Sequence, residues 1–195
     1  MVLSGDNLAV IDEFVTAQFD SSGFLGWKDP RSVLLFPFWL SCLVELGFRR
    51  IRPTVITRHP ASVVQSMARR SNLVALAPSF GCSVAELALQ MWTAYSHALL
   101  DLVEQTDCFV SSHEWFLESN SARYELGRCV DYLGMPTSQP EMTAALQWLD
   151  PGAVHHGDPD PLGILSGEEE SLLLHGDLLG YARTQRARWR LRGAA

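Results

Sequence analysis

The chain is short of positive charge and of long apolar runs. Fifteen Lys and Arg residues stand against 22 Asp and Glu residues, which gives a net charge of −7. Nucleic-acid binding favours basic faces, so this balance argues against it, while leaving room for a local basic pocket for an anionic nucleotide. No apolar run approaches the roughly 20 residues that span a bilayer. The longest run, near 33–44, is broken by Pro37, Ser41 and Cys42. We therefore expect neither nucleic acid nor membrane as a partner.

Paired cysteine motifs and repeats are also missing, and we expect no leader. The four cysteines are widely spread, without a CxxC or ligand spacing, at Cys42, Cys82, Cys108 and Cys129. This pattern is typical of reduced core thiols and predicts a cytoplasmic location. The first ten residues lack the basic start and the long apolar run of a signal peptide. A length of 195 residues with a 47% apolar fraction predicts one globular domain over 1–195.

A strand, a turn and a helix at residues 54–71 organise the rest of the chain. The β-branched run at 54–57 predicts a buried strand, and Pro60 suits the first turn of the helix that follows. In α/β folds ligands collect beyond the carboxyl ends of strands, where Arg58 lies. The helix N-terminus and the Arg58 guanidinium both favour an anion, and Ser66 offers a hydroxyl donor. The alternative is structural: Arg58 merely ends the strand and Ser66 is solvated.

Two segments resemble the PAPS-dependent sulfotransferases, where PAPS is 3′-phosphoadenosine 5′-phosphosulfate. Arg58-His59-Pro60 followed by Ser66 resembles the segment that binds the 3′-phosphate in that family. Residues 26–31 (GWKDPR) followed by 34–39 (LLFPFW) are similar to the "KDPR…LLP.W" segment of bacterial sulfotransferase-like proteins. The order and separation of the two segments also match. The resemblance covers residues 24–150.

The resemblance implies an α/β fold of the three-layer, parallel-sheet, P-loop-NTPase-like sulfotransferase type, helix-rich and N-terminally truncated. It implies transfer of a sulfuryl group from PAPS to a hydroxyl or amine acceptor, with 3′,5′-adenosine bisphosphate as product and no metal. Arg58 and Ser66 would hold the 3′-phosphate, and Lys28 would contact the transferring group, where an ammonium stabilises charge on the bridging oxygen. The alternative for Lys28 is an ordinary surface lysine at the end of a strand over 24–28. Carbohydrate, small alcohol, amine and peptide acceptors all stay open, because variable loops build acceptor pockets.

The general base of such a reaction has several candidates. Many family members place a His two residues after the Lys or a Glu just before it, and these positions hold Pro30 and Trp27 here. Asp29 is nearest in sequence, since a carboxylate can accept the acceptor's proton. An Asp before a Pro also commonly caps the following turn. His59, in the other loop, is a further candidate.

The rest of the chain is expected to be mostly helical. Expected elements are helices at 7–19, 37–47, 83–105, 121–133, 141–149 and 168–192, an apolar loop at 72–81 and a parallel strand at 108–111. His113 follows that strand where the family often has a Tyr near the adenine, so the resemblance makes it a candidate to stack on the base. His155 and His156 lack a third ligand at a familiar spacing, which favours a loop over a metal site. The arginines of the last helix are expected on a solvated face, with a partner-binding patch as the alternative.

The largest departure from the family lies at the N-terminus. Full sulfotransferases open with a strand, a Gly/Ser/Thr-rich loop and a helix, and that loop cradles the 5′-phosphosulfate through backbone N–H groups. Nothing before residue 24 matches that loop. We expect a fragment, a degenerate relative, or a chain whose sheet is completed by an oligomer or a second chain. The expected function is therefore sulfuryl transfer, with a non-catalytic nucleotide-binding or protein-interaction module as the alternative.

Overall fold

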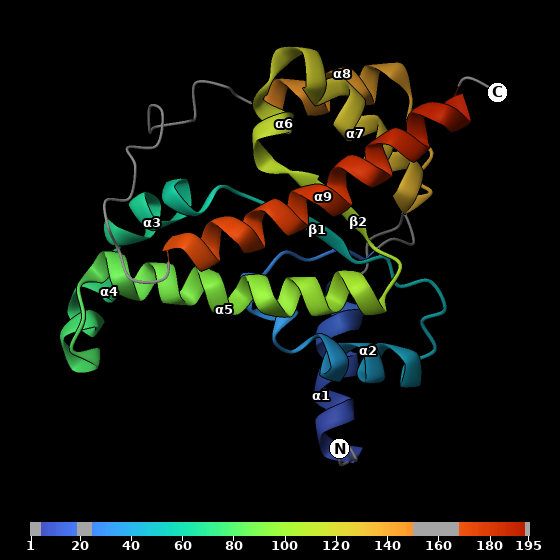
Figure 1. The fold of residues 1–195 in the computed structure, drawn as a ribbon. Coiled ribbons are helices and arrows are strands. Elements are labelled where there is room, and N and C mark those ends of the chain that lie inside the picture. The colour runs from blue at the N-terminus through green and yellow to red at the C-terminus, as the bar shows by residue number, and fades with distance from the viewer. Residues whose placement is uncertain (1–4, 19–24, 150–167, 194–195) are drawn as a thin grey trace. The chain divides into compact units, whose positions relative to one another are not determined.

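The computed structural model describes residues 5–18, 25–149 and 168–193 (Figure 1). Where the sequence predicts one domain, the chain divides into two compact units, Met1–Ile51 and Arg52–Ala195. Each unit is described by itself below.

The first unit is helical where the structure describes it. Its elements are α1 (Gly5–Gln18), the 3-10 helix η1 (Pro30–Val33) and α2 (Phe36–Glu45). The two helices predicted at 7–19 and 37–47 are thus confirmed to within two residues. Aromatic side chains gather around Trp39, whose ring centroid lies 5.4 Å from that of Trp27 and 6.4 Å from that of Phe14.

The second unit combines a small parallel sheet with many helices. Its elements are β1 (Thr54–Thr57), α3 (Pro60–Ala68), α4 (Ser71–Leu76), η2 (Ala77–Phe80), α5 (Val84–Gln105), β2 (Phe109–Ser112), α6 (His113–Leu117), α7 (Ser119–Leu133), α8 (Gln139–Trp148) and α9 (Glu168–Gly193). The two strands predicted for this unit, at 54–57 and 108–111, both form, and they pair in parallel with Val55 opposite Val110. The protein is therefore a helix-rich α/β protein, with a two-stranded sheet among its described residues.

Local capping signals set the helix boundaries. Ser83 begins α5 with a capping box, in which its hydroxyl accepts from the Glu86 N–H and the Glu86 carboxylate accepts from the Ser83 N–H. Ser138 and Glu141 repeat this arrangement at α8. Gly134 ends α7 at a φ of 68°, in the left-handed region that glycine adopts without steric cost. These boundaries lie within two residues of the predicted ones.

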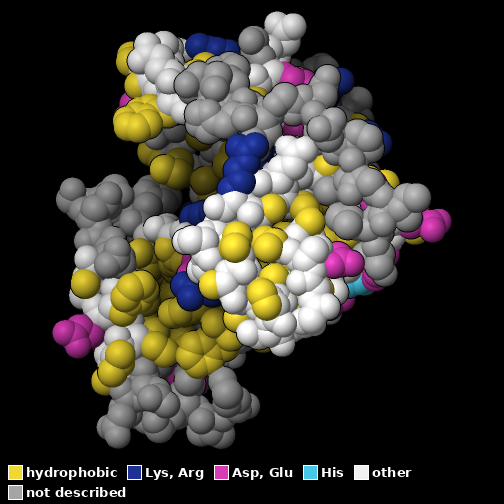
Figure 2. Space-filling view, turned by 90° about the vertical axis from the view of Figure 1, so that its left-hand side faces the viewer, with side chains coloured by type: hydrophobic (Ala, Val, Ile, Leu, Met, Phe, Trp, Pro, Cys, Tyr) yellow, Lys and Arg dark blue, Asp and Glu magenta, His cyan; other side chains and the backbone are white. Residues whose placement is uncertain are grey.

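The loop predicted at 72–81 is wrong, because α4 and η2 occupy it. Leu73 and Ala77, four residues apart, share one helical face and pack in a cluster with Leu87 of α5. Pro78 is compatible because it lies in the first turn of η2, where a missing N–H costs little. The apolar residues are thus divided between the core and the surface, where Phe80 is exposed. Figure 2 views the side of the molecule on which α4 lies in Figure 1, and hydrophobic side chains reach the surface there with Lys and Arg among them.

Helices cover the two strands unequally. On one face, Val55, Val110 and Ala182 form a buried cluster against α5 and α9, which run side by side in Figure 1. On the other face, α7 covers β2, since Arg128 stacks over the Phe109 ring at 5.0 Å. Ile56 points to that second face from β1 and is 41% exposed. Among the described residues, helices therefore cover both faces of β2, whereas the second face of β1 is only partly covered.

A side chain closes the outer edge of β2. The Gln185 amide oxygen accepts from the Val110 N–H at 2.9 Å, and its nitrogen donates to the Cys108 carbonyl at 2.7 Å. This pair of hydrogen bonds reproduces what a peptide group of a neighbouring strand would make. Gln185 therefore fastens α9 to the sheet edge.

A buried ionic cluster joins α7, α9 and β2. Glu125 is fully buried and accepts from the hydroxyl of Ser111 at 2.6 Å and from the guanidinium of Arg128. Arg186 Nε lies 2.9 Å from Glu125 Oε1, and its guanidinium stacks over the Trp115 ring at 4.7 Å. The expectation that the α9 arginines share a solvated face is thus wrong for Arg186, which is an internal counter-ion.

Candidate functional site

The turn between β1 and α3 forms as the sequence predicts. β1 ends at Thr57 and α3 begins at Pro60, so Arg58 and His59 make the turn at the carboxyl end of the strand. The ring nitrogen Nδ1 of His59 accepts from the Ala61 N–H at 3.3 Å and caps the helix. The sequence identified His59 as a possible base, whereas in the structure this nitrogen serves the helix N-terminus.

Side chains from two other helices hold the backbone of this turn. The indole nitrogen of Trp92, on α5, donates to the carbonyl of Arg58 at 3.3 Å. The Glu114 carboxylate, on α6, accepts from the His59 N–H at 2.9 Å through Oε1. Its other oxygen accepts from the hydroxyl of Ser112, the last residue of β2. The turn is thereby tied to the end of the neighbouring strand.

The side chain of Arg58 has no internal partner in the part of the chain that the structure describes. Its guanidinium makes no hydrogen bond and no ion pair there, and it is partly exposed. Burial lowers the pKa of the neighbouring His113, and the positive charge of Arg58 lowers it further. Arg58 and His113 thus come together from the ends of two adjacent parallel strands. A partly buried cation without a partner is suited to hold an anion.

Ser66 lies on the second turn of α3 and is partly buried. No hydrogen bond joins its hydroxyl to Arg58 or to His113. The structure therefore places Ser66 on the helix that begins at the turn, and its pairing with Arg58 around a common phosphate stays a prediction.

Lys28 and Asp29 belong to the first unit. Residues 25–29 form no regular element, so the strand predicted at 24–28 is wrong over 25–28, and Phe24 lies outside the described residues. The physical reason is the Asp29-Pro30 pair, which starts η1 directly after this segment. Lys28, the only lysine of the chain, is exposed.

Asp29 takes the capping role that the sequence left open. Its carboxylate accepts from the backbone N–H of Arg31 at 2.9 Å and from the guanidinium of Arg31 at 2.6 Å. These contacts with Arg31 lower the pKa of Asp29 to about 2. A carboxylate that binds protons so weakly is a poor general base near neutral pH.

A buried histidine that was not expected from the sequence lies behind the turn. His175, on α9, lies with its ring centroid 5.2 Å from that of His59, and its Nδ1 is 3.4 Å from the hydroxyl of Thr57. Burial lowers the pKa of His175, and the nearby His59 lowers it further. No local signal marks His175 in the sequence, since it is one histidine in a long helix. Glu114 had a weak signal, because it lies two residues after the end of a strand.

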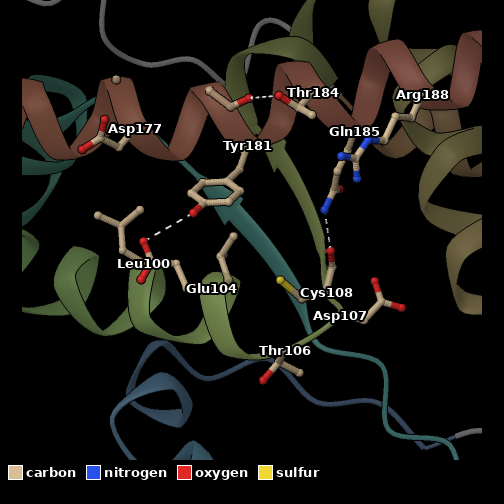
Figure 3. A pocket seen from close by; sticks show the side chains of 13 residues that line it. Leu100, Glu104, Thr106, Asp107, Cys108, Asp177, Tyr181, Thr184, Gln185 and Arg188 are labelled. Atoms are coloured by element: carbon tan, nitrogen blue, oxygen red, sulfur yellow. Dashed lines mark hydrogen bonds between the residues drawn. The ribbon is translucent and has the colours of Figure 1, made fainter.

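A hollow of the second unit lies elsewhere, between α5 and α9 (Figure 3). It has a volume of about 750 Å³. Some of its polar side chains are engaged with each other or with backbone: the Tyr181 hydroxyl donates to Glu104 at 3.3 Å, and Gln185 holds the Cys108 carbonyl. Burial and the charge of Asp107 raise the pKa of Cys108 to about 11, which keeps its thiol protonated and unreactive. Size alone therefore does not favour this hollow over the strand ends as the functional site.

Within the described ranges, no group of three or more His, Cys, Asp or Glu side chains is arranged to hold a metal ion. His155 and His156 lie outside those ranges. No single described helix is both long and apolar enough to cross a membrane; Ser71–Phe80 and Val84–Gln105 meet the length and composition test together, but only as a pair bent by 91°.

No protein-family model, curated protein or solved structure matches the chain. The resemblance to sulfotransferases therefore depends on the sequence motifs, and the functional assignment depends on the chemistry of the strand ends.

Proposed function

We propose that the second unit binds the 3′-phosphate of a phosphorylated adenosine at the carboxyl ends of β1 and β2. The observation that carries this proposal is the guanidinium of Arg58, which has no internal partner among the described residues and stands at the end of a parallel strand. The start of α3 adds the partial positive charge of a helix N-terminus. His113 adds a ring that can stack on a base, and Ser66 adds a hydroxyl donor to the phosphate.

The reaction proposed for this protein is sulfuryl transfer from PAPS to a hydroxyl or amine acceptor, on a sulfotransferase-type fold with a P-loop-like parallel sheet. Lys28 stabilises the charge that develops on the bridging oxygen, as the resemblance implies. The partners proposed for the protein are thus the nucleotide donor and the acceptor. A second chain that completes the sheet is proposed as a further partner. The four cysteines form no disulfide, and we retain the cytoplasm as the proposed location.

One observation favours the alternative of a non-catalytic nucleotide-binding module. The carboxylate of Asp29 is engaged by Arg31 and has a pKa of about 2. Asp29, the candidate general base nearest to Lys28 in the sequence, is therefore a weak proton acceptor. A chain with a nucleotide site and no base would bind the donor without transferring sulfate. Release of 3′,5′-adenosine bisphosphate from PAPS, measured over hydroxyl and amine acceptors, separates the two functions.

Calorimetric titration with 3′,5′-adenosine bisphosphate tests the nucleotide site. Replacing Arg58 by Ala removes one charge-assisted contact, which is worth about 1.5–3 kcal/mol, or roughly ten- to a hundredfold in affinity. Arg69→Ala is the matched control, because Arg69 is an exposed arginine of the same unit at the far end of α3. Absence of binding to folded wild-type protein, or an equal loss in both variants, would refute the proposed site.

A further inference from the structure

The backbone of the turn between β1 and α3 is held from outside at two points. Trp92 binds the carbonyl of Arg58, and Glu114 binds the N–H of His59. These two groups belong to one planar peptide group, the one that joins Arg58 to His59, so the two contacts fix the orientation of the backbone at Arg58. The direction of the guanidinium thus depends on side chains that come from α5 and α6.

Glu114 is an unexpected residue beside a site for an anion. Burial acts to raise the pKa of Glu114, but hydrogen bonds from the His59 N–H and the Ser112 hydroxyl outweigh it, and the pKa is lowered. The group is therefore ionised at neutral pH. A negative charge here opposes a phosphate by Coulomb repulsion, so direct electrostatics cannot explain its presence.

The contacts of Glu114 point to a different role. Both carboxylate oxygens are used, one by the His59 N–H at 2.9 Å and the other by the hydroxyl of Ser112 at the end of β2. One side chain therefore fixes the β1 turn to the end of β2. Arg58 and His113, two residues of the proposed site, follow directly from these strand ends.

We propose that Glu114 is a positioning residue for the phosphate site, which acts through the N–H of His59 to orient Arg58. This inference rests on the proposed nucleotide-binding function. It assigns a sign to each contribution: the hydrogen-bond acceptor of Glu114 supports binding of the anion, whereas its charge opposes it.

Two substitutions separate the acceptor from the charge. Glu114→Gln keeps an oxygen that can accept from the His59 N–H and removes the charge, while Glu114→Ala removes both. Glu141→Ala is the matched control, because Glu141 also accepts from a backbone N–H and a serine hydroxyl, at the exposed start of α8.

The first measurement is the affinity for 3′,5′-adenosine bisphosphate by calorimetry. We expect Glu114→Gln to bind as tightly as the wild type or more tightly, Glu114→Ala to bind at least about tenfold more weakly, and Glu141→Ala to be unchanged. A charge acting alone predicts the opposite for Glu114→Ala, namely tighter binding. That result, or a tenfold loss in Glu114→Gln, would overturn the positioning role.

The second measurement needs no nucleotide. Hydrogen exchange at the His59 amide should quicken in Glu114→Ala and stay near the wild-type rate in Glu114→Gln and Glu141→Ala. Unchanged exchange in Glu114→Ala would overturn the inference even if binding were lost. If the wild type fails to bind the bisphosphate, the proposed function is refuted, and exchange at His59 still reports separately whether Glu114 holds the turn.

Discussion

Removal of the Glu125 carboxylate should destabilise the second unit more than any surface substitution. Glu125 is 0% exposed and Arg128 is 3% exposed, so neither charge can be compensated by water once its partner is lost. Breaking a buried pair by deleting one partner costs about 3–5 kcal/mol. The total stability of a domain is about 5–15 kcal/mol, so Glu125→Ala should remove roughly a fifth of it or more.

The appropriate control is an exposed ion pair of the same unit, between α5 and α9. His97 Nε2 lies 2.9 Å from Glu170 Oε1, with the two side chains 55% and 56% exposed. Such pairs contribute about 0–1 kcal/mol, because water and salt screen them. Glu170→Ala should therefore leave stability almost unchanged.

Urea unfolding measures the loss, and native-state hydrogen exchange at the β2 amides reports on the second unit specifically. The double variant Glu125→Leu with Arg128→Met should recover part of the stability, because an apolar pair replaces two buried charges. A loss below about 1 kcal/mol in Glu125→Ala, equal to that of the control, would refute the view that the cluster fastens α7 and α9 to β2.

Two further predictions concern catalysis and pH. In a transfer assay, Lys28→Ala should lower the rate roughly 10²–10³-fold and leave the affinity for the bisphosphate unchanged. Asp29→Asn should change the rate less than about tenfold. A hundredfold loss of rate in Asp29→Asn would restore Asp29 as the base. Burial lowers the pKa values of His113 and His175 in the folded protein, so below their ordinary value of about 6.5 the unfolded chain binds more protons. The contribution of these histidines to stability should therefore be full above pH 7 and decrease as the pH drops through 6.5. Thermal unfolding at pH 7.5 and 5.5 should show a smaller decrease in stability for His175→Gln than for the wild type. Equal decreases in the two proteins would contradict the lowered pKa of His175.

Elements with strong local signals were predicted closely from the sequence. The β-branched run placed β1 at Thr54–Thr57, and Pro60 placed the start of α3. The capping residues Ser83 and Gly134 set the ends of α5 and α7. Each of these signals acts between residues a few positions apart, so it can be detected without knowing the fold.

Errors arose where one local signal had two meanings. Pro78 and Gly81 indicated a loop, but a proline also suits the first turn of a helix, and the burial of Leu73 and Ala77 decided in favour of α4 and η2. Asp29 before Pro30 was compatible with a base or a cap, and the position of Arg31 in η1 selected the cap.

The sequence by itself determined that a basic residue, Arg58, ends a strand and precedes a helix, since both elements depend on residues within the same short segment. Only the tertiary structure decided what surrounds it. Trp92 and Glu114 reach the turn from helices 34 and 55 residues away along the chain, and His175 lies 118 residues beyond Thr57. Periodicity places such residues on a helix, but only the packing of α5, α6 and α9 around two strands brings them to the strand ends.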